Sequence, residues 1–241
     1  MPRPVADAGP ADRRPVPRDL LEGGSVEVAP ALLNKLLAHG GRVGRIVEVE
    51  AYRGSEDPAS HAFGGPTRRN ATMFGPAGHL YVYFSYGVHW CANVVVARTG
   101  AAEAVLLRAL APLDGLDEMW AARPAARRPR DLCSGPGKLC QALAIDGAHD
   151  GADLVGVGGE LQLLDDGTAP PARPGRGPRV GITLAAERPW RWWVPGDENI
   201  SGGPGPRASY RRRAPVRAAP PRPARSAGAA EGPPRVPPGR R

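Results

Sequence analysis

Two glutamates and a tyrosine, Glu48, Glu50 and Tyr52, occupy every second position of the segment GRIVEVEAY. This alternation is typical of a β-strand and puts the three side chains on one face. A carboxylate on the working face of a sheet can hold a water molecule or accept a proton, and a placed general base contributes roughly 10²–10⁴-fold to a rate. An edge strand with a solvated acidic face has the same pattern, and the pattern alone favours that simpler interpretation.

The tyrosines are concentrated in one short region. Apart from Tyr210, they are Tyr52, Tyr81, Tyr83 and Tyr86. Stacking on a nucleobase contributes about 1–3 kcal/mol per base, so such a cluster could form a base pocket with a wedge beside it. A cross-strand aromatic cluster in a β core is the alternative, and the residues alone favour it slightly. Tyr86 is the exception, because its position at a turn suits a core residue poorly.

Metal binding is not expected from the cysteines and histidines. The three cysteines have no C-x-x-C spacing and the five histidines are scattered, whereas a structural zinc site needs four suitably spaced ligands. We therefore expect no metal and interpret the cysteines as small buried side chains.

Two further segments could contact phosphates. SGPGK at residues 134–138 could offer backbone N–H groups at the start of a helix, although it lacks the spacing of a Walker loop. An ordinary helix start explains it equally well. Arginines at 123, 127, 128 and 130 could follow a DNA backbone, but a solvated loop is the commoner explanation.

The elements that must position these residues form an α+β pattern. We predict helices over residues 30–40, 113–123 and 134–143, and strands over residues 44–52, 79–84, 89–97, 104–110, 154–164 and 178–184. A turn at residues 85–87 makes the second and third strands a hairpin, and residues 53–78 form a long ordered loop of functional length. The expected fold is a single mixed domain around a curved, mostly antiparallel β-sheet with flanking helices.

The charge of the chain is distributed unevenly. The 241 residues carry a net charge of +8, but residues 203–241 contain 10 Arg, 10 Pro and one acidic residue, Glu231. This tail therefore carries +9, which leaves −1 for residues 1–202. A segment with so few apolar side chains cannot offset its ordering entropy, so we expect disorder there and in an arm over residues 1–18. Residues 19–202 are the expected domain.

The tail has two interpretations of equal weight. It could tether the protein to nucleic acid without sequence preference, because each arginine can neutralise a phosphate. It could equally be a biased sequence without a role. No run of eighteen apolar residues and no secretory leader is present, so we expect no membrane span and a cytoplasmic protein, associated with the nucleoid in a bacterium.

Four stretches in this order resemble the alkyladenine (3-methyladenine) DNA glycosylase family. They are GRIVEVEAYRGSEDPASHAFGGPTRRNATMFGPAGHLYVYFSYGVHWCANVV, AVLLRALAPLDG, DLCSGPGKLCQALAI and PRVGITLAAERPWRWWV, and they cover most of residues 19–202. The resemblance implies that Glu50 activates the hydrolytic water and that Arg108 holds this water and the nearby backbone. It implies a base pocket walled by Tyr52, His61 and Tyr83, with Asn93 rejecting guanine and Tyr86 as the intercalating wedge. The sequence departs from the family beside the wedge, at Val88 and His89.

The resemblance further implies a monomeric, cofactor-free enzyme of base excision repair. It would flip alkylated or deaminated purines, such as 3-methyladenine, 7-methylguanine, hypoxanthine and ethenoadenine, from duplex DNA and hydrolyse the N-glycosidic bond. The only lysines, Lys35 and Lys138, lie outside the first matched stretch, which carries the proposed base and most of the pocket residues, so we predict no lyase activity. The alternatives are a catalytically silent DNA-damage-binding protein of the same fold and a basic tether with a merely structural body.

Overall fold

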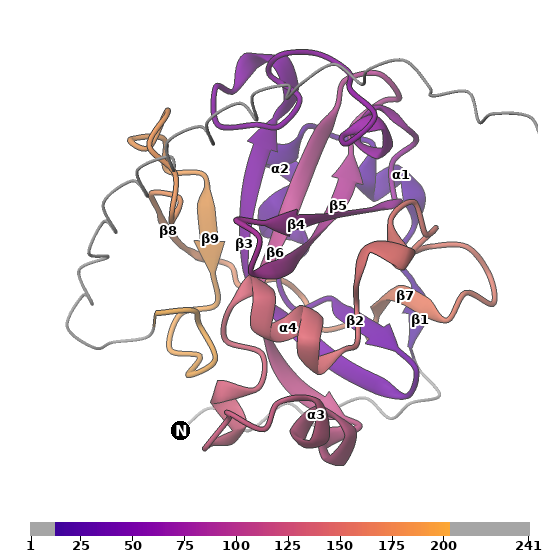
Figure 1. Cartoon of the computed structure of the whole chain (residues 1–241), viewed down its shortest axis with the longest axis vertical. Coiled ribbons are helices and arrows are strands. Elements are labelled where there is room, and N and C mark those ends of the chain that lie inside the picture. The colour runs from indigo at the N-terminus through magenta and orange to yellow at the C-terminus, as the bar shows by residue number, and fades with distance from the viewer. Residues whose placement is uncertain (1–12, 203–241) are drawn as a thin grey trace, which may run out of the picture. The chain divides into compact units, whose positions relative to one another are not determined.

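A single antiparallel sheet organises the chain in the computed structural model, which describes residues 13–202 (Figure 1). Its neighbouring strands follow the order β1-β7-β2-β3-β6-β5-β4, and β9 pairs with both β3 and β8. The strands are β1 (Arg14–Pro15), β2 (Leu36–His39), β3 (Arg42–Arg53), β4 (Leu80–Ser85), β5 (His89–Val96), β6 (Glu103–Asp114), β7 (Leu161–Asp165), β8 (Gly175–Gly177) and β9 (Arg191–Trp193). The predicted α+β fold with a curved, antiparallel sheet is confirmed.

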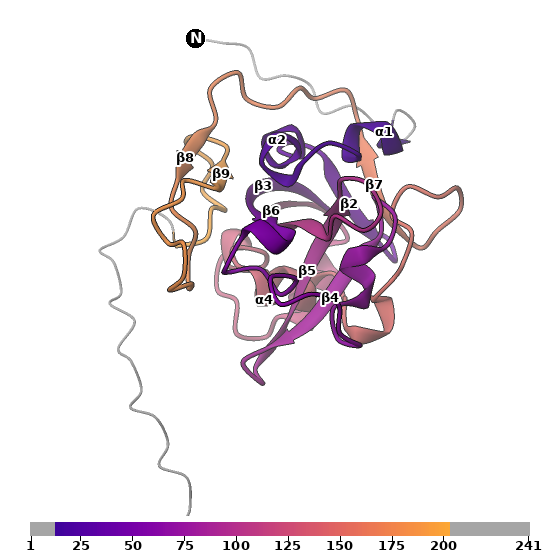
Figure 2. The same ribbon diagram turned by 90° about the horizontal axis from the view of Figure 1, so that it is seen from above.

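Short helices flank this sheet. They are α1 (Arg18–Leu21), α2 (Ser25–Ala31), α3 (Leu116–Ala122) and α4 (Pro136–Ala142), with single 3₁₀ turns η2 (Gly54–Glu56), η3 (Ala71–Phe74), η4 (Pro129–Asp131) and η5 (Gly147–His149). The helices predicted over residues 113–123 and 134–143 are confirmed as α3 and α4. Figure 2 shows the curl of the sheet, with β8 and β9, which join it through β3, at one side of the view.

The two faces of the sheet carry different clusters, as alternation along a strand requires. The main core joins α2 and α4 to one face through side chains such as Val82, Val94 and Leu107. The opposite face carries a smaller cluster that includes Tyr81 and Met73 and is covered by the long loop over residues 53–78. Residues that alternate away from the main core therefore face the loop, and this is where the site lies.

A bulge interrupts the alternation of β3. The register with β6 shifts between Ile46 and Glu48 and again before Val49. Ile46 consequently joins the main core with Val49 and Ala51, whereas strict alternation would place it on the face of the glutamates. The bulge also divides one edge of β3, because β2 pairs with its first residues and β9 with Glu48 to Glu50.

The helix predicted over residues 30–40 is wrong. The helix, α2, ends at Ala31, and Pro30 lies in its last turn rather than its first. Asn34 then adopts a left-handed conformation with φ 68°, and its N–H donates to the carbonyl oxygen of Ile46 at 2.9 Å. Pairing with β3 therefore takes this segment into the sheet as β2, because it satisfies backbone groups that a longer helix would have used itself.

The connection between β2 and β3 contains the signal that distinguishes a hairpin from a helix end. Gly40 and Gly41 join His39 to Arg42 with φ values of 54° and 80°. A two-residue loop with positive φ at both positions is the favoured hairpin turn, and Gly-Gly is a typical sequence for it. The helix predicted over residues 30–40 instead ended at the first of these glycines.

Three other expectations change in the structure. The strand predicted over residues 178–184 is wrong, because that segment is a loop between β8 and β9. The strand predicted over residues 154–164 is limited to β7. Residues 13–18 of the expected disordered arm belong to the fold, since β1 pairs with β7. The rest of the arm, residues 1–12, and the tail, residues 203–241, lie outside the described residues.

The described residues also bear on cysteines and membranes. Cys91, Cys133 and Cys140 are buried free thiols, as the sequence predicts. Burial raises the pKa of the Cys133 thiol to about 12, which keeps it protonated at neutral pH.

Between residues 13 and 202, no helix combines the length and the apolar character needed to cross a bilayer.

Candidate active site

A cavity of about 710 Å³ opens where β3, β4, β5 and β6 face the long loop and the segment after β8. Its lining includes the residues that the sequence assigned to a base pocket and its surroundings: Tyr52, His61, Tyr83, Tyr86, Asn93 and Arg108. Period-two alternation explains the convergence, because each of these strand residues points away from the main core. The remaining predicted residue, Glu50, lies behind this lining and is fully buried.

The Glu50 carboxylate is held by three neighbours that themselves line the cavity. Its Oε1 accepts a hydrogen bond from the Val180 N–H at 2.7 Å and pairs with Arg108 Nη1 at 3.0 Å. Its Oε2 accepts a hydrogen bond from the Tyr52 hydroxyl at 2.9 Å. An ionised carboxylate offers about four acceptor positions, so one position on Oε2 has no donor among residues 13–202.

Burial sets the proton affinity of this carboxylate. Desolvation raises the pKa of Glu50, and it outweighs the opposing effects of Arg108 and of the Val180 and Tyr52 hydrogen bonds. The pKa of Tyr52 is also raised, by burial and by the adjacent Glu50 charge, so Tyr52 remains a hydrogen-bond donor at neutral pH. A carboxylate with a raised pKa is a stronger base when it is ionised, as proton abstraction from water requires.

An aromatic wall forms one side of the cavity. The His61 ring packs edge-on against Tyr83, with 4.4 Å between ring centroids, and its Nδ1 lies 3.0 Å from the Tyr81 hydroxyl. Partial desolvation and the nearby charge of Arg69 lower the pKa of His61, which favours the neutral imidazole. Burial raises the pKa of Tyr81 to about 12, so its hydroxyl is also neutral. The His61 and Tyr81 side chains of the wall are thus uncharged, and the Arg69 guanidinium lies 5.8 Å from the Tyr83 ring centroid.

Asn93 presents a polar group to this cavity from β5. Its Nδ2 donates to the backbone carbonyl oxygen of Tyr81 at 3.0 Å, across the β4–β5 pair in which the two residues are register partners. This contact orients the amide and leaves its Oδ1 without a hydrogen-bond donor among residues 13–202. A fixed carbonyl oxygen next to a stacking wall can distinguish purines by the groups on their edges.

Tyr86 projects from the tip of the β4–β5 hairpin and is 84% exposed. The turn is closed by the Val88 N–H, which donates to the Ser85 carbonyl oxygen at 2.9 Å. Both central residues have positive φ, 50° at Tyr86 and 67° at Gly87. A bulky residue in this region costs about 1–2 kcal/mol, and such strain is concentrated at functional sites. An exposed aromatic ring held at that cost at the cavity mouth suits insertion into a partner.

The segment after β8 contributes residues that the sequence analysis missed. Arg179 forms a fully buried pair with Asp57 through two contacts, one of them Nη2 to Oδ1 at 2.8 Å. Its guanidinium stacks on the Tyr52 ring at 4.7 Å from the centroid. Arg179 thus fixes the loop that presents the Val180 N–H to Glu50. The sequence analysis assigned residues 178–184 to a strand and gave Arg179 no role. The available signal was its position as the second residue of the matched stretch PRVGITLAAERPWRWWV.

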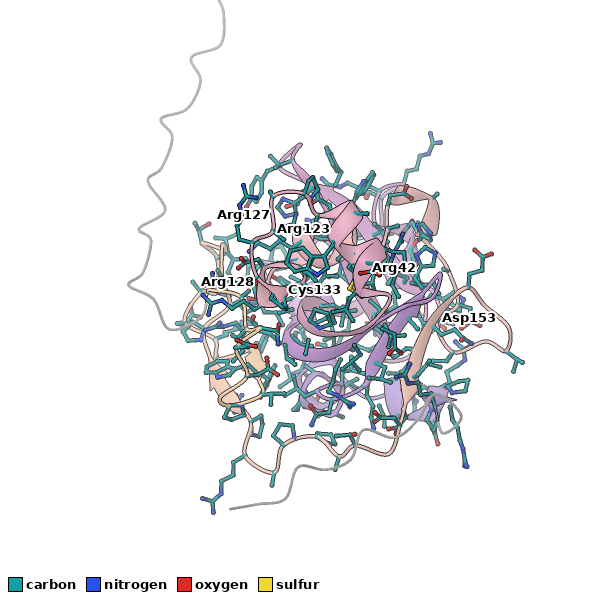
Figure 3. All side chains as sticks on the ribbon, turned by 90° about the horizontal axis from the view of Figure 1, so that it is seen from below. Arg42, Arg123, Arg127, Arg128, Cys133 and Asp153 are labelled. Atoms are coloured by element: carbon teal, nitrogen blue, oxygen red, sulfur yellow. The ribbon has the colours of Figure 1, made fainter. Side chains whose placement is uncertain are left out.

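The two segments that the sequence offered for phosphate contact, the arginines between residues 123 and 130 and the segment 134–138, lie largely outside the cavity. Figure 3 labels Arg123, Arg127 and Arg128, which come from the region between α3 and η4. Arg128 pairs with Asp131 at 3.1 Å on the surface, and none of these arginines lines the cavity. Of the segment at 134–138, only Pro136 reaches the lining. Contact with a DNA backbone therefore stays a prediction for both segments.

Known proteins with similar sequences cover nearly all of the described chain. The family model "Methylpurine-DNA glycosylase (MPG)" matches residues 19–198. A protein of Burkholderia cenocepacia named "Putative 3-methyladenine DNA glycosylase" is 57% identical over 188 residues, which are 78% of this chain and 91% of its own. A protein of the same name from Frankia casuarinae is 49% identical and covers 75% of this chain and 89% of its own. Another from Agrobacterium fabrum is 48% identical and covers 77% of this chain and 92% of its own. The matched range contains every residue of the cavity lining.

Proposed function

The chain belongs to the methylpurine-DNA glycosylase family, and we propose that its cavity receives alkylated and deaminated purines flipped from duplex DNA. As a DNA glycosylase it is a hydrolase of N-glycosyl bonds that acts in DNA repair. The proposed bases are 3-methyladenine, 7-methylguanine, hypoxanthine and 1,N6-ethenoadenine. The observation that carries the proposal is the buried Glu50 carboxylate, whose three donors border the cavity and leave one acceptor position open.

The proposed reaction is attack of a water molecule on the anomeric carbon of the flipped nucleotide. As the N-glycosidic bond breaks, its electron pair leaves with the base, and positive charge develops on the sugar. Glu50 accepts the proton of the attacking water, and its negative charge stabilises the oxocarbenium character of the transition state. Arg108 supports this role by keeping Glu50 ionised and by presenting its remaining donors near the cavity.

The aromatic wall supports recognition of damaged purines. Bases alkylated at N3 or N7 carry a positive charge, and a cation stacks favourably on the face of a tyrosine ring. Arg179 and Arg69 lie over one face of Tyr52 and of Tyr83, respectively, so the proposed stacking uses the opposite faces. The neutral state favoured for His61 avoids repulsion of such a base. We assign to the Asn93 amide the rejection of guanine through a clash with its exocyclic amine.

Flipping requires that the duplex be opened, which costs a few kcal/mol and less at a damaged pair. Tyr86 is proposed to occupy the space left in the base stack, so that the flipped state is held long enough for hydrolysis. The only lysines, Lys35 and Lys138, are absent from the cavity lining, which supports hydrolysis without strand cleavage. Lys35 instead pairs with Asp165 at 2.6 Å. We further propose that the enzyme acts as a monomer in the cytoplasm.

The experiment that tests the proposal is base release from duplexes that each contain one of the four lesions. The Glu50→Gln variant is expected to release base at least about 10²-fold more slowly in single turnovers, with its DNA affinity retained. Asp166→Asn is the matched control, since Asp166 is also a buried, ion-paired carboxylate but pairs with Arg45 instead. A Glu50→Gln variant as fast as the wild type would remove the proposed base. Strand cleavage by pure protein without alkali would contradict the absence of lyase activity.

A further inference from the structure

A second buried carboxylate, Glu48, lies beside the proposed catalytic pair and has no role in the reaction described so far. It is fully buried on the same face of β3 as Glu50. Its Oε1 accepts hydrogen bonds from Arg108 Nε and Arg191 Nη1, both at 3.0 Å, and its Oε2 accepts one from the Ser201 N–H at 2.6 Å. Burying a carboxylate costs free energy even when charged partners offset part of that cost, so we expect the purpose of Glu48 to lie in the geometry that it imposes on its neighbours.

The contacts of Arg108 indicate that purpose. The guanidinium uses Nε for Glu48 and Nη2 for the Ser201 hydroxyl, each at 3.0 Å, and this leaves Nη1 to reach Glu50 at 3.0 Å. A planar guanidinium fixed at two of its nitrogens cannot rotate away from the third partner. Glu48 and Ser201 therefore determine which edge of Arg108 meets the catalytic carboxylate and the cavity.

We propose that Glu48 and Ser201 are positioning residues that hold Arg108 in the orientation in which it supports Glu50. The inference rests on the proposed function, because it assigns a purpose to Arg108 only if Glu50 acts as the base. Neither Glu48 nor Ser201 lines the cavity, so both act through Arg108 rather than on the DNA.

Arg191 explains how two carboxylates share this small buried space. It lies on β9 opposite Glu50 in register, and its Nη1 pairs with Glu48 while its Nε donates to the Pro178 carbonyl oxygen. Because Arg191 balances the charge of Glu48, the charge of Arg108 remains available to Glu50. The β9 strand and the segment up to Ser201 thus complete the site from the C-terminal side.

The first test is a double-mutant cycle measured by single-turnover base release. Glu48→Gln is expected to slow hydrolysis about 10- to 100-fold, the range seen for partners that orient a functional side chain, with DNA affinity changed less than about 3-fold. In an Arg108→Ala background, the same change should slow hydrolysis no more than about 2-fold. Equal losses in both backgrounds would indicate a merely structural role and overturn the proposal, as would an unchanged rate in the wild-type background.

Ser201 provides a second test that perturbs the core less. Ser201→Ala removes only the hydroxyl that meets Arg108, since the backbone N–H still reaches Glu48. We expect a rate roughly 3- to 10-fold lower, and rescue by Ser201→Thr, which restores the hydroxyl. If Glu48→Gln fails to fold, this pair decides the question, and a Ser201→Ala variant as fast as the wild type overturns the proposal.

A readout independent of activity separates this inference from the proposed function. The ¹⁵Nε–Hε signal of Arg108, assigned by its loss in Arg108→Lys, should exchange slowly with solvent in the wild type and measurably faster in Glu48→Gln. Asp166→Asn, the remote buried-carboxylate control, should leave it unchanged. An inactive wild-type protein with these signals would contradict the proposed function, but not the contact by which Glu48 orients Arg108. Unchanged exchange in Glu48→Gln would contradict the positioning whatever the activity.

Discussion

Glu50 combines complete burial with three hydrogen-bonding or charged partners, and burial still dominates its proton affinity. Such a group destabilises the fold when it ionises, because its pKa is higher in the folded than in the unfolded state. At the residue scale, the carboxylate that we propose as the base is therefore held at a cost in stability.

We expect this cost to appear as a pH dependence of the unfolding free energy. Below the ordinary value of 4.5 the carboxyl is protonated in both states. As the pH rises from there through the folded-state pKa, the unfolded chain ionises first and the wild type loses stability. Glu50→Gln should lack this loss. The unfolding free energy of the variant minus that of the wild type should therefore increase with pH and then become constant. Urea unfolding between pH 4 and pH 8 measures it, and an advantage that shrinks with rising pH would contradict the raised pKa.

Tyr86 gives a second residue-scale prediction, in which stability and activity change in opposite directions. Tyr86→Gly places a residue without a Cβ at φ 50°, and should stabilise the hairpin by about 1 kcal/mol or leave it unchanged. The same change removes the proposed wedge, so base release should slow. Thermal unfolding and single-turnover rates on one preparation measure both. A variant that is less stable and fully active would contradict both the strain and the wedge.

At the element scale, the site depends on a loop that has little secondary structure of its own. The buried Asp57–Arg179 pair joins the loop after β3 to the segment after β8, and Arg179 also donates to the Ala51 carbonyl oxygen at 3.0 Å. This anchor determines where the Val180 N–H and the Tyr52 ring lie. It therefore links two segments that are distant in sequence at the point where both meet Glu50.

Breaking this anchor should be costly. Asp57→Asn leaves the Arg179 charge buried without its carboxylate, and we expect a loss of about 3–5 kcal/mol in unfolding free energy near neutral pH. Arg179 lowers the pKa of Asp57, so the stability from this pair is present above the ordinary value of 3.8 and is lost as the pH falls through the folded-state pKa. The difference between wild type and variant should therefore shrink in acid, opposite in sign to the Glu50→Gln effect. A difference independent of pH would contradict the charged pair.

At the scale of the whole molecule, charge and chemistry lie in different parts of the chain. The net charge of +8 is the sum of +9 in residues 203–241 and −1 in residues 1–202. The cavity and all residues assigned to it lie within residues 13–202. Recognition of a damaged base should therefore depend on the cavity, and any contribution of the tail should be electrostatic and independent of sequence.

Truncation after Gly202 tests this division. Base release should survive at saturating protein, whereas DNA affinity should fall and the slope of log Kd against log salt concentration should become less steep. A charge-matched tail with its ten arginines replaced by lysines is the control, and it should keep most of the salt dependence. Loss of base release in the truncated protein at low salt would show that the catalytic unit extends beyond residue 202.

The sequence by itself determined which side chains share a strand face and where the chain turns. Alternation predicted that Glu48, Glu50 and Tyr52 share one face, because strand geometry fixes side-chain direction from neighbouring residues alone. The turn predicted at residues 85–87 indicated that Tyr86 is exposed, as it is in the structure. The resemblance identified the family. The segment 30–40 shows the limit of local patterns, since its pairing with β3 competes with a helix that the same residues could form.

Only the tertiary structure decided what surrounds the glutamates. Glu50 is buried because Val180, Arg108 and Tyr52, from three different segments, close around it. The charge of Glu48 is paired with Arg108 and Arg191, and the Ser201 N–H donates a hydrogen bond to it from far along the chain. The pattern alone favoured a solvated acidic face, and the structure shows the opposite. The physical reason is that desolvation and charge pairing depend on groups brought together in space, and these set whether a carboxylate is a surface charge or a base.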